Sequence, residues 1–213
     1  MSKLNLPNKL TVLRFILVPI FMVVMMLPIN DTISRIVSAF LFIVTALTDM
    51  LDGKIARKLN QVSNLGKMLD PIADKLTVFA IAIILFLRFH QAENETLVAF
   101  SWVFLLFIIK DLIMLGFGLF MILLGMHPVA AEIYGKLATL AFYSVMALIM
   151  AIGPEVGAFR NYYVLPDNIM MILVVISVIL TFLAFFSYIP NVVKQCAERF
   201  GWGKYKKNKT VNK

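Results

Sequence analysis

The chain has 213 residues, of which 61% are hydrophobic and 15% are charged, and its mean hydropathy is +0.90. A soluble domain needs more polar surface than this to cover itself, so the composition excludes a soluble globular protein. The net charge of +8 comes without interleaved basic and aromatic residues, so we expect the basic residues to face anionic lipid and expect no nucleic-acid partner. The sequence therefore predicts an all-α integral membrane protein.

Six apolar segments are typical of membrane-spanning helices, each of which needs roughly 20 residues. They cover about 8–27, 32–57, shortly before 70 to 89, 96–124, 131–152 and 168–193. We expect one six-helix membrane domain over residues 1–200 and a basic cytoplasmic tail over residues 201–213. The first apolar run is too long for a signal peptide and lacks a small-residue cleavage site, so we interpret it as a retained span.

The lysines and arginines are unevenly divided between the two sides of such a bundle. With six spans, both termini and the second interhelical loop lie on one side. That side receives Lys3, Lys9, Arg14, Lys54, Arg57, Lys58, Lys67, Lys75 and the tail, and the other receives Arg35, Arg88 and Arg160. Because positive residues concentrate in the cytoplasm, we predict a multi-pass protein of the cell membrane with both termini cytoplasmic.

Four of the twelve acidic residues lie between positions 49 and 74. Asp49 and Asp52 are three residues apart at the end of the second predicted helix, and Asp70 and Asp74 are four apart near the start of the third. Each spacing puts its pair on one helix face. A loop of about ten residues joins the two helices, so we expect antiparallel packing and converging carboxylates. Such a cluster needs compensating charge and favours hard cations, Mg²⁺ or Mn²⁺ with Ca²⁺ as the alternative, in a polar cavity at the cytoplasmic face.

Small and basic residues surround these aspartates. Gly53 follows Asp52 directly, and Gly66 lies one helical turn before Asp70, so a ligand or a neighbouring backbone can approach closely at both. Arg57 lies one turn after Gly53 and could donate two hydrogen bonds to a phosphate. The alternative interpretations are simple helix packing for the glycines and ordinary interfacial acids, neutralised by nearby lysines and arginines, for the aspartates.

The whole segment reads Asp49-x2-Asp52-Gly53-x2-Ala56-Arg57-x8-Gly66-x3-Asp70-x3-Asp74. It resembles the signature of the CDP-alcohol phosphotransferases, with every motif position filled. The resemblance implies transfer of a phosphatidyl or similar group from a CDP-linked donor to an alcohol, with release of CMP. It also implies which residues form the site. Two metal ions would be bound by Asp49, Asp52 and Asp70, with Asp74 as a shared ligand and the general base. The nucleotide and its diphosphate would lie along Gly53, Ala56, Arg57 and Gly66, and Asn8, Thr11 and Arg14 would close over the nucleotide. The alternative for the last three is a helix cap with a cytoplasmic anchor.

The segment Leu69-Asp70-Pro71-x-Ala73-Asp74-Lys75 is similar to phosphatidylglycerophosphate synthases and the related cardiolipin synthases. Our leading hypothesis is therefore transfer from CDP-diacylglycerol to glycerol 3-phosphate. The alternatives are cardiolipin synthesis from phosphatidylglycerol, or another reaction of this family. A cation transporter or channel is a different class, but it predicts acidic residues near mid-membrane, whereas these lie at one face. The resemblance also admits a homodimer.

Three lysines are candidates for binding a phosphate on the acceptor: Lys75, Lys110 and Lys136. Lys110 lies mid-span, where an unpaired charge costs about 3 kcal/mol or more, and we expect the adjacent Asp111 to point elsewhere on the helix. Bacterial phosphatidylglycerophosphate synthases usually show Arg-Glu at this pair, and cardiolipin synthases often show Arg-Asp. The alternatives are an intramembrane ion pair for Lys110 and an interfacial anchor for Lys136.

Overall fold

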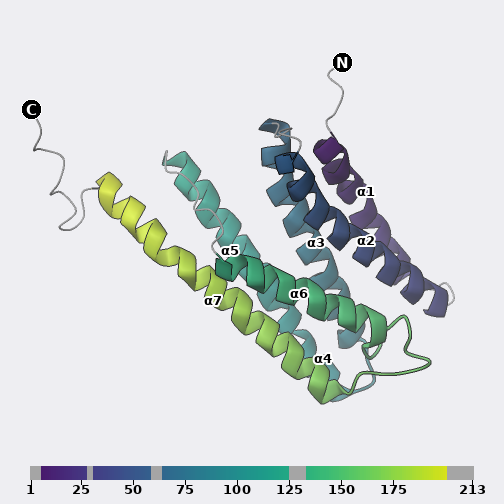
Figure 1. Cartoon of the computed structure of the whole chain (residues 1–213). Coiled ribbons are helices and arrows are strands. Elements are labelled where there is room, and N and C mark those ends of the chain that lie inside the picture. Colours follow the sequence, from purple (N-terminus) through teal and green to yellow (C-terminus); the bar gives the residue numbers. More distant parts are fainter. Residues whose placement is uncertain (1–5, 28–30, 59–63, 125–132, 201–213) are drawn as a thin grey trace, which may run out of the picture.

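The computed structural model is an elongated bundle of helices (Figure 1). It describes residues 6–27, 31–58, 64–124 and 133–200, and within the helices it leaves out the side chains of 6–8, 31, 49–58, 64–71, 74, 119, 122, 133–134 and 198–200. The described residues form helices joined by turns, with no strand among them. The helices are α1 (Leu6–Met26), α2 (Asp31–Lys58), α3 (Asn64–His90), α4 (Glu95–Ser101), α5 (Val103–Leu123), α6 (Ile133–Ile152) and α7 (Asp167–Phe200).

Four stretches of the described helices are long and apolar enough to cross a membrane. They are Lys9–Met26, Glu95–Gly118, Gly135–Ile152 and Asp167–Ala197, and α2 adds a shorter apolar run, Thr32–Thr48. Many large apolar side chains point outward from the bundle, such as Leu123 and Phe40, which are 76% and 65% exposed. A surface of this kind is covered by lipid rather than by water. The expected all-α integral membrane protein is confirmed at this level.

The predicted fourth helix, residues 96–124, coincides with one apolar stretch over Glu95–Gly118, but a turn that we did not predict divides it into two helices. Trp102 separates α4 from α5, and the Leu105 N–H donates to the Trp102 carbonyl at 3.1 Å, the tighter spacing of a 3₁₀ turn. The indole of Trp102 packs against Phe86 and His90 of α3, with ring centroids 5.2 and 5.8 Å apart. These ring contacts accompany a turn that periodicity alone does not reveal.

Two other boundaries, the start of α3 and the end of α7, differ from the prediction by one or two turns. The helix α3 begins at Asn64, so Gly66 and Lys67 lie in the helix and not in the expected ten-residue loop. The helix α7 continues to Phe200 through Pro190, beyond the expected end near residue 193. The predicted tail, residues 201–213, lies outside the described residues.

The helices contact one another in a ring. The helix α1 packs against α2 and α3, α3 against α5, α5 against α7, α7 against α6, and α6 against α2. Inside this arrangement, aromatic side chains from four helices pack against one another. Phe21 lies 6.1 Å from Phe42 and Phe42 lies 6.2 Å from Tyr143, while Phe142 lies 4.9 Å from Phe107, all measured between centroids. Burial of these large rings holds α1, α2, α5 and α6 together.

One end of the bundle is closed by the connection between α6 and α7. Gly153 and Gly157 lie so close to carbonyl oxygens that an added Cβ would be 2.5 and 2.6 Å from them, and Glu155 takes a positive φ of 64°. Asn161 of this connection donates to the Thr32 hydroxyl at 3.4 Å. The connection therefore joins the end of α6 to the start of α2.

The opposite end carries the aspartate motif. In Figure 1 the start of α1, the end of α2, the start of α3 and the end of α7 lie toward this end. Both ends of the described chain thus lie on one side of the bundle.

Candidate functional site

The two aspartate pairs lie at similar distances from the neighbouring ends of α2 and α3. At a rise of 1.5 Å per residue, Asp52 lies about 9 Å before the end of α2 and Asp70 lies about 9 Å after the start of α3. Asp49 and Asp74 lie about 14 and 15 Å from the same two ends, roughly one turn deeper. The side chains of all four lie outside the described part of the chain, so their convergence on a metal stays a prediction.

The predicted donor-site residues lie on α2 and α3, which carry the aspartates, and on α1. Gly53, Ala56 and Arg57 lie in the last two turns of α2, Gly66 in the first turn of α3, and Asn8 in the first turn of α1. Their side chains also lie outside the described residues. Their contact with a nucleotide likewise stays a prediction.

Thr11 and Arg14 of α1 are described, and both are 1% exposed. They lie on a helix that packs against both α2 and α3. Arg14 lies about 12 Å from the start of α1, a depth comparable to that of the aspartate pairs. A buried arginine is expensive unless anionic groups compensate it. Its predicted contact with the nucleotide stays a prediction, as does the alternative of a cytoplasmic anchor.

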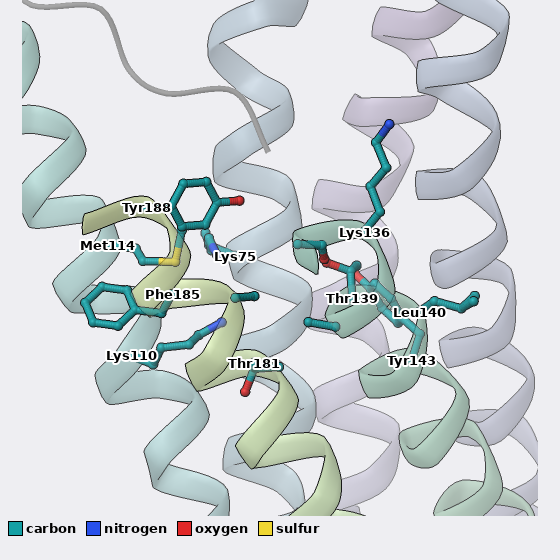
Figure 2. A pocket seen from close by; sticks show the side chains of 13 residues that line it. Lys75, Lys110, Met114, Lys136, Thr139, Leu140, Tyr143, Thr181, Phe185 and Tyr188 are labelled. Atoms are coloured by element: carbon teal, nitrogen blue, oxygen red, sulfur yellow. The ribbon is translucent and has the colours of Figure 1, made fainter. Parts of the chain in front are cut away.

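A pocket of about 420 Å³ lies beside this region (Figure 2). Its walls come from α3, α5, α6 and α7, through Lys75, Lys110, Met114, Gly135, Lys136, Ala138, Thr139, Leu140, Tyr143, Thr181, Ala184, Phe185 and Tyr188. Because Lys75 follows Asp74 in α3, the pocket reaches the level of Asp74. Its volume falls within the range of small-molecule sites, roughly 300–1,000 Å³.

Two of the three predicted acceptor lysines, Lys75 and Lys110, contact one carboxylate, that of Asp111, which lies behind this wall. The Lys75 Nζ lies 2.6 Å from the Asp111 Oδ1, and the Lys110 Nζ lies 2.7 Å from the same oxygen. The expectation that Asp111 points away from Lys110 was therefore wrong. Adjacent helix positions do diverge at Cβ, but the four-carbon stem of lysine is long enough to bring its amine back.

The third lysine stands apart. Figure 2 shows the Lys136 side chain extending away from the amines of Lys75 and Lys110, and this lysine is exposed. It lies in the first turn of α6, which begins at Ile133 and whose N-terminus carries a partial positive charge. All three lysines line the pocket, but only two of them form a cluster.

The α7 wall was missed by sequence reasoning. Thr181, Phe185 and Tyr188 line the pocket from the middle of a long apolar helix. In the sequence, only their hydroxyl and aromatic groups could have indicated a pocket. Residues that face lipid carry the same groups, so this pattern does not distinguish a pocket wall from a lipid-facing surface. Thr181 donates its hydroxyl to the Val178 carbonyl at 2.8 Å, so its polar group is used within the helix.

Fold and site together define a helical membrane protein with a cationic pocket next to an acidic motif, which suits chemistry on phosphate groups. The family model described as CDP-alcohol phosphatidyltransferase matches residues 4–183. The chain belongs to the CDP-alcohol phosphatidyltransferase family.

Several relatives carry a more specific name, CDP-diacylglycerol–glycerol-3-phosphate 3-phosphatidyltransferase. The chain is 38% identical to that of Bacillus subtilis over 68% of its own length and 77% of the relative's. It is 31% identical to that of Haemophilus influenzae over 88% of its own length and 92% of the relative's. It is 41% identical to that of Rickettsia typhi over 47% of its own length and 56% of the relative's.

Proposed function

We propose that this protein transfers the phosphatidyl group of CDP-diacylglycerol to the hydroxyl of glycerol 3-phosphate, giving phosphatidylglycerophosphate and CMP. The observation that carries the proposal is the likeness to the Haemophilus influenzae relative of that name, which extends over nine-tenths of both chains. The match to the family model over residues 4–183 also supports the reaction class. The family match gives no support to the alternative of a cation transporter or channel.

The pocket supports an acceptor that carries a phosphate. Three lysines line it, and Asp111 pairs with two of them, Lys75 and Lys110, so the described charges leave an excess of positive charge. Ammonium groups bind phosphate oxygens through short, charge-assisted hydrogen bonds. The N-terminal turn of α6 at the same pocket adds attraction for an anion. A neutral alcohol would gain little from these groups.

The proposed roles of the motif residues follow the family resemblance. The donor set offered by Asp49, Asp52, Asp70 and Asp74, four carboxylates on two helices, fits Mg²⁺ or Mn²⁺. Bound there, two such ions would offset the charge of the diphosphate and of the leaving CMP. Asp74 takes the proton of the acceptor hydroxyl, which makes the oxygen a better nucleophile. Arg57 and Arg14 hold the nucleotide and its diphosphate.

We also propose six membrane spans, with α4 and α5 together forming the fourth. The helices α2 and α3 are 28 and 27 residues long, and a span needs about 20. The excess of lysine and arginine at the motif end supports a cytoplasmic position for both termini and for the active site. A homodimer stays a prediction of the resemblance.

The test is release of CMP by the purified full-length protein. CDP-diacylglycerol and Mg²⁺ or Mn²⁺ are supplied with glycerol 3-phosphate, with phosphatidylglycerol, or with neither. We expect CMP release with glycerol 3-phosphate and loss of that release on chelation of the metal. CMP release with phosphatidylglycerol alone would make the protein a cardiolipin synthase. No release with any acceptor would reject the reaction class.

A further inference from the structure

Asp111 is a buried acid for which the reaction has no evident use. It lies in the middle of α5, and its residue is 0% exposed. It contacts the cluster that lines the pocket, but it does not line the pocket itself. Its Oδ2 accepts no hydrogen bond from any side chain or backbone group that the structure describes. A buried carboxylate is costly, so its position calls for an explanation.

The contacts of the other oxygen suggest one. The Asp111 Oδ1 lies within 2.6 Å of one lysine amine and 2.7 Å of another, so it holds two ammonium groups side by side. Ammonium groups this close repel each other, and more strongly in a buried site than in water. The carboxylate behind the pocket wall offsets that repulsion. Both amines can then stay at the surface that a ligand meets.

The two lysines come from different helices, which makes the contact an interhelical one. Lys75 lies in α3, directly after Asp74, and Lys110 lies in α5 beside Asp111. The contact therefore fixes one point of α5 to α3 at the level of the proposed general base. A phosphate bound by the two amines would lie close to the helix that carries that base.

We propose that Asp111 is a positioning residue for the acceptor: it holds Lys75 and Lys110 together in the pocket wall so that they bind the acceptor phosphate and present its hydroxyl beside Asp74. This proposal rests on the proposed function. It assigns to Asp111 an effect on the binding of the acceptor and none on the binding of the nucleotide donor. If Asp111 served only the stability of the fold, its substitution would not raise the KM for the acceptor selectively over the KM for the donor.

The test is steady-state kinetics of the purified full-length enzyme with each substrate varied in turn. We expect Asp111→Asn to raise the KM for glycerol 3-phosphate about ten-fold or more, because two charge-assisted contacts lose their geometry. The KM for CDP-diacylglycerol should stay within about two-fold of wild type. Asp111→Glu, which keeps the charge but displaces it, should give an intermediate KM for the acceptor. Asp167→Asn is the matched control, since Asp167 lies at the far end, where its carboxylate accepts from Asn94 at 2.8 Å.

The outcomes separate this proposal from the proposed function. A wild-type enzyme that does not use glycerol 3-phosphate rejects the proposed function, and with it this inference. A wild-type enzyme that uses it, together with an Asp111→Asn variant whose two KM values are unchanged or rise equally, rejects the positioning role alone. Should the Asn variant fail to fold, the Glu variant decides: an acceptor KM equal to that of wild type contradicts the proposal.

Discussion

Lys75 and Asp111 are 36 positions apart in the chain, yet the Lys75 Nζ donates to the Asp111 Oδ1 at 2.6 Å. This contact joins α3, which carries the second aspartate pair, to α5, which supplies part of the pocket wall. It therefore links the acidic motif to the cationic pocket. Asp74 and the pocket lysines can act on one substrate only if α3 and α5 keep this alignment.

Asp74→Asn should lower turnover far more than it lowers the binding of nucleotide. An amide cannot take the proton of the acceptor hydroxyl, and loss of a general base typically lowers kcat by about 10²–10⁴. Steady-state CMP release gives kcat, and titration with CDP in the presence of Mg²⁺ gives nucleotide affinity. Full activity in this variant would remove Asp74 as the base. Equal loss of binding and turnover would reduce it to a metal ligand.

Lys136→Ala should raise the KM for glycerol 3-phosphate and leave the KM for CDP-diacylglycerol unchanged. Loss of a hydrogen bond to a charged group costs about 1.5–3 kcal/mol, or roughly ten-fold or more in affinity. The exposure of Lys136 puts the expected effect at the lower end of this range. Arg160→Ala is the control, because that side chain pairs with Glu155 at 3.3 Å at the other end of the bundle. An unchanged acceptor KM would favour the interfacial anchor.

Gly153→Ala should lower the thermal stability of the protein in detergent. The added Cβ would lie 2.5 Å from the Ile149 carbonyl oxygen, so the backbone at the end of α6 must shift at a cost of about 1–3 kcal/mol. Gly116→Ala is the matched control, since a Cβ there meets nothing within 4 Å and alanine is the better helix former. The melting temperature measures both. Equal stability of the two variants would contradict the described closure of this end.

Cys196 allows a test of sidedness without engineering, because it is the single cysteine of the chain. It lies about 44 Å along α7 from Asp167, farther than the roughly 30 Å thickness of the hydrocarbon core. A membrane-impermeant maleimide should therefore label it in inside-out vesicles and not in right-side-out vesicles. Tyr162→Cys in a Cys196→Ser background should show the reverse, as Tyr162 is 90% exposed at the other end. The opposite pattern would invert the proposed orientation.

The fold could be predicted from the sequence to within a turn or two at most helix ends. Long apolar runs interrupted by charges determine where a membrane helix lies, and these runs matched α1, α2, α6 and most of α7. The turn at Trp102 could not be predicted, because it coincides with packing of an indole against another helix. The folded connection after Ile152 was also missed, since its contacts with Thr32 join residues distant in the chain.

The features of the candidate site that depend on spacing within one helix could be predicted from the sequence, but those that depend on contacts between helices could not. The aspartate pairs follow from spacings within single helices. The shared carboxylate of Lys75 and Lys110 does not, because it depends on how α5 approaches α3 and on the reach of a flexible lysine stem. The α7 wall was hidden for a related reason, since Phe185 in a pocket and Phe186 on the outside look alike in a sequence.

The most direct test of the central claim is transfer of label from glycerol 3-phosphate into lipid. Purified protein would be given CDP-diacylglycerol, Mg²⁺ and radiolabelled glycerol 3-phosphate, and the organic phase would be assayed for label alongside CMP in the aqueous phase. We predict one labelled lipid, phosphatidylglycerophosphate, formed in equal molar amount to CMP. CMP release without labelled lipid, or labelled lipid only when phosphatidylglycerol replaces glycerol 3-phosphate as the labelled acceptor, would contradict this assignment.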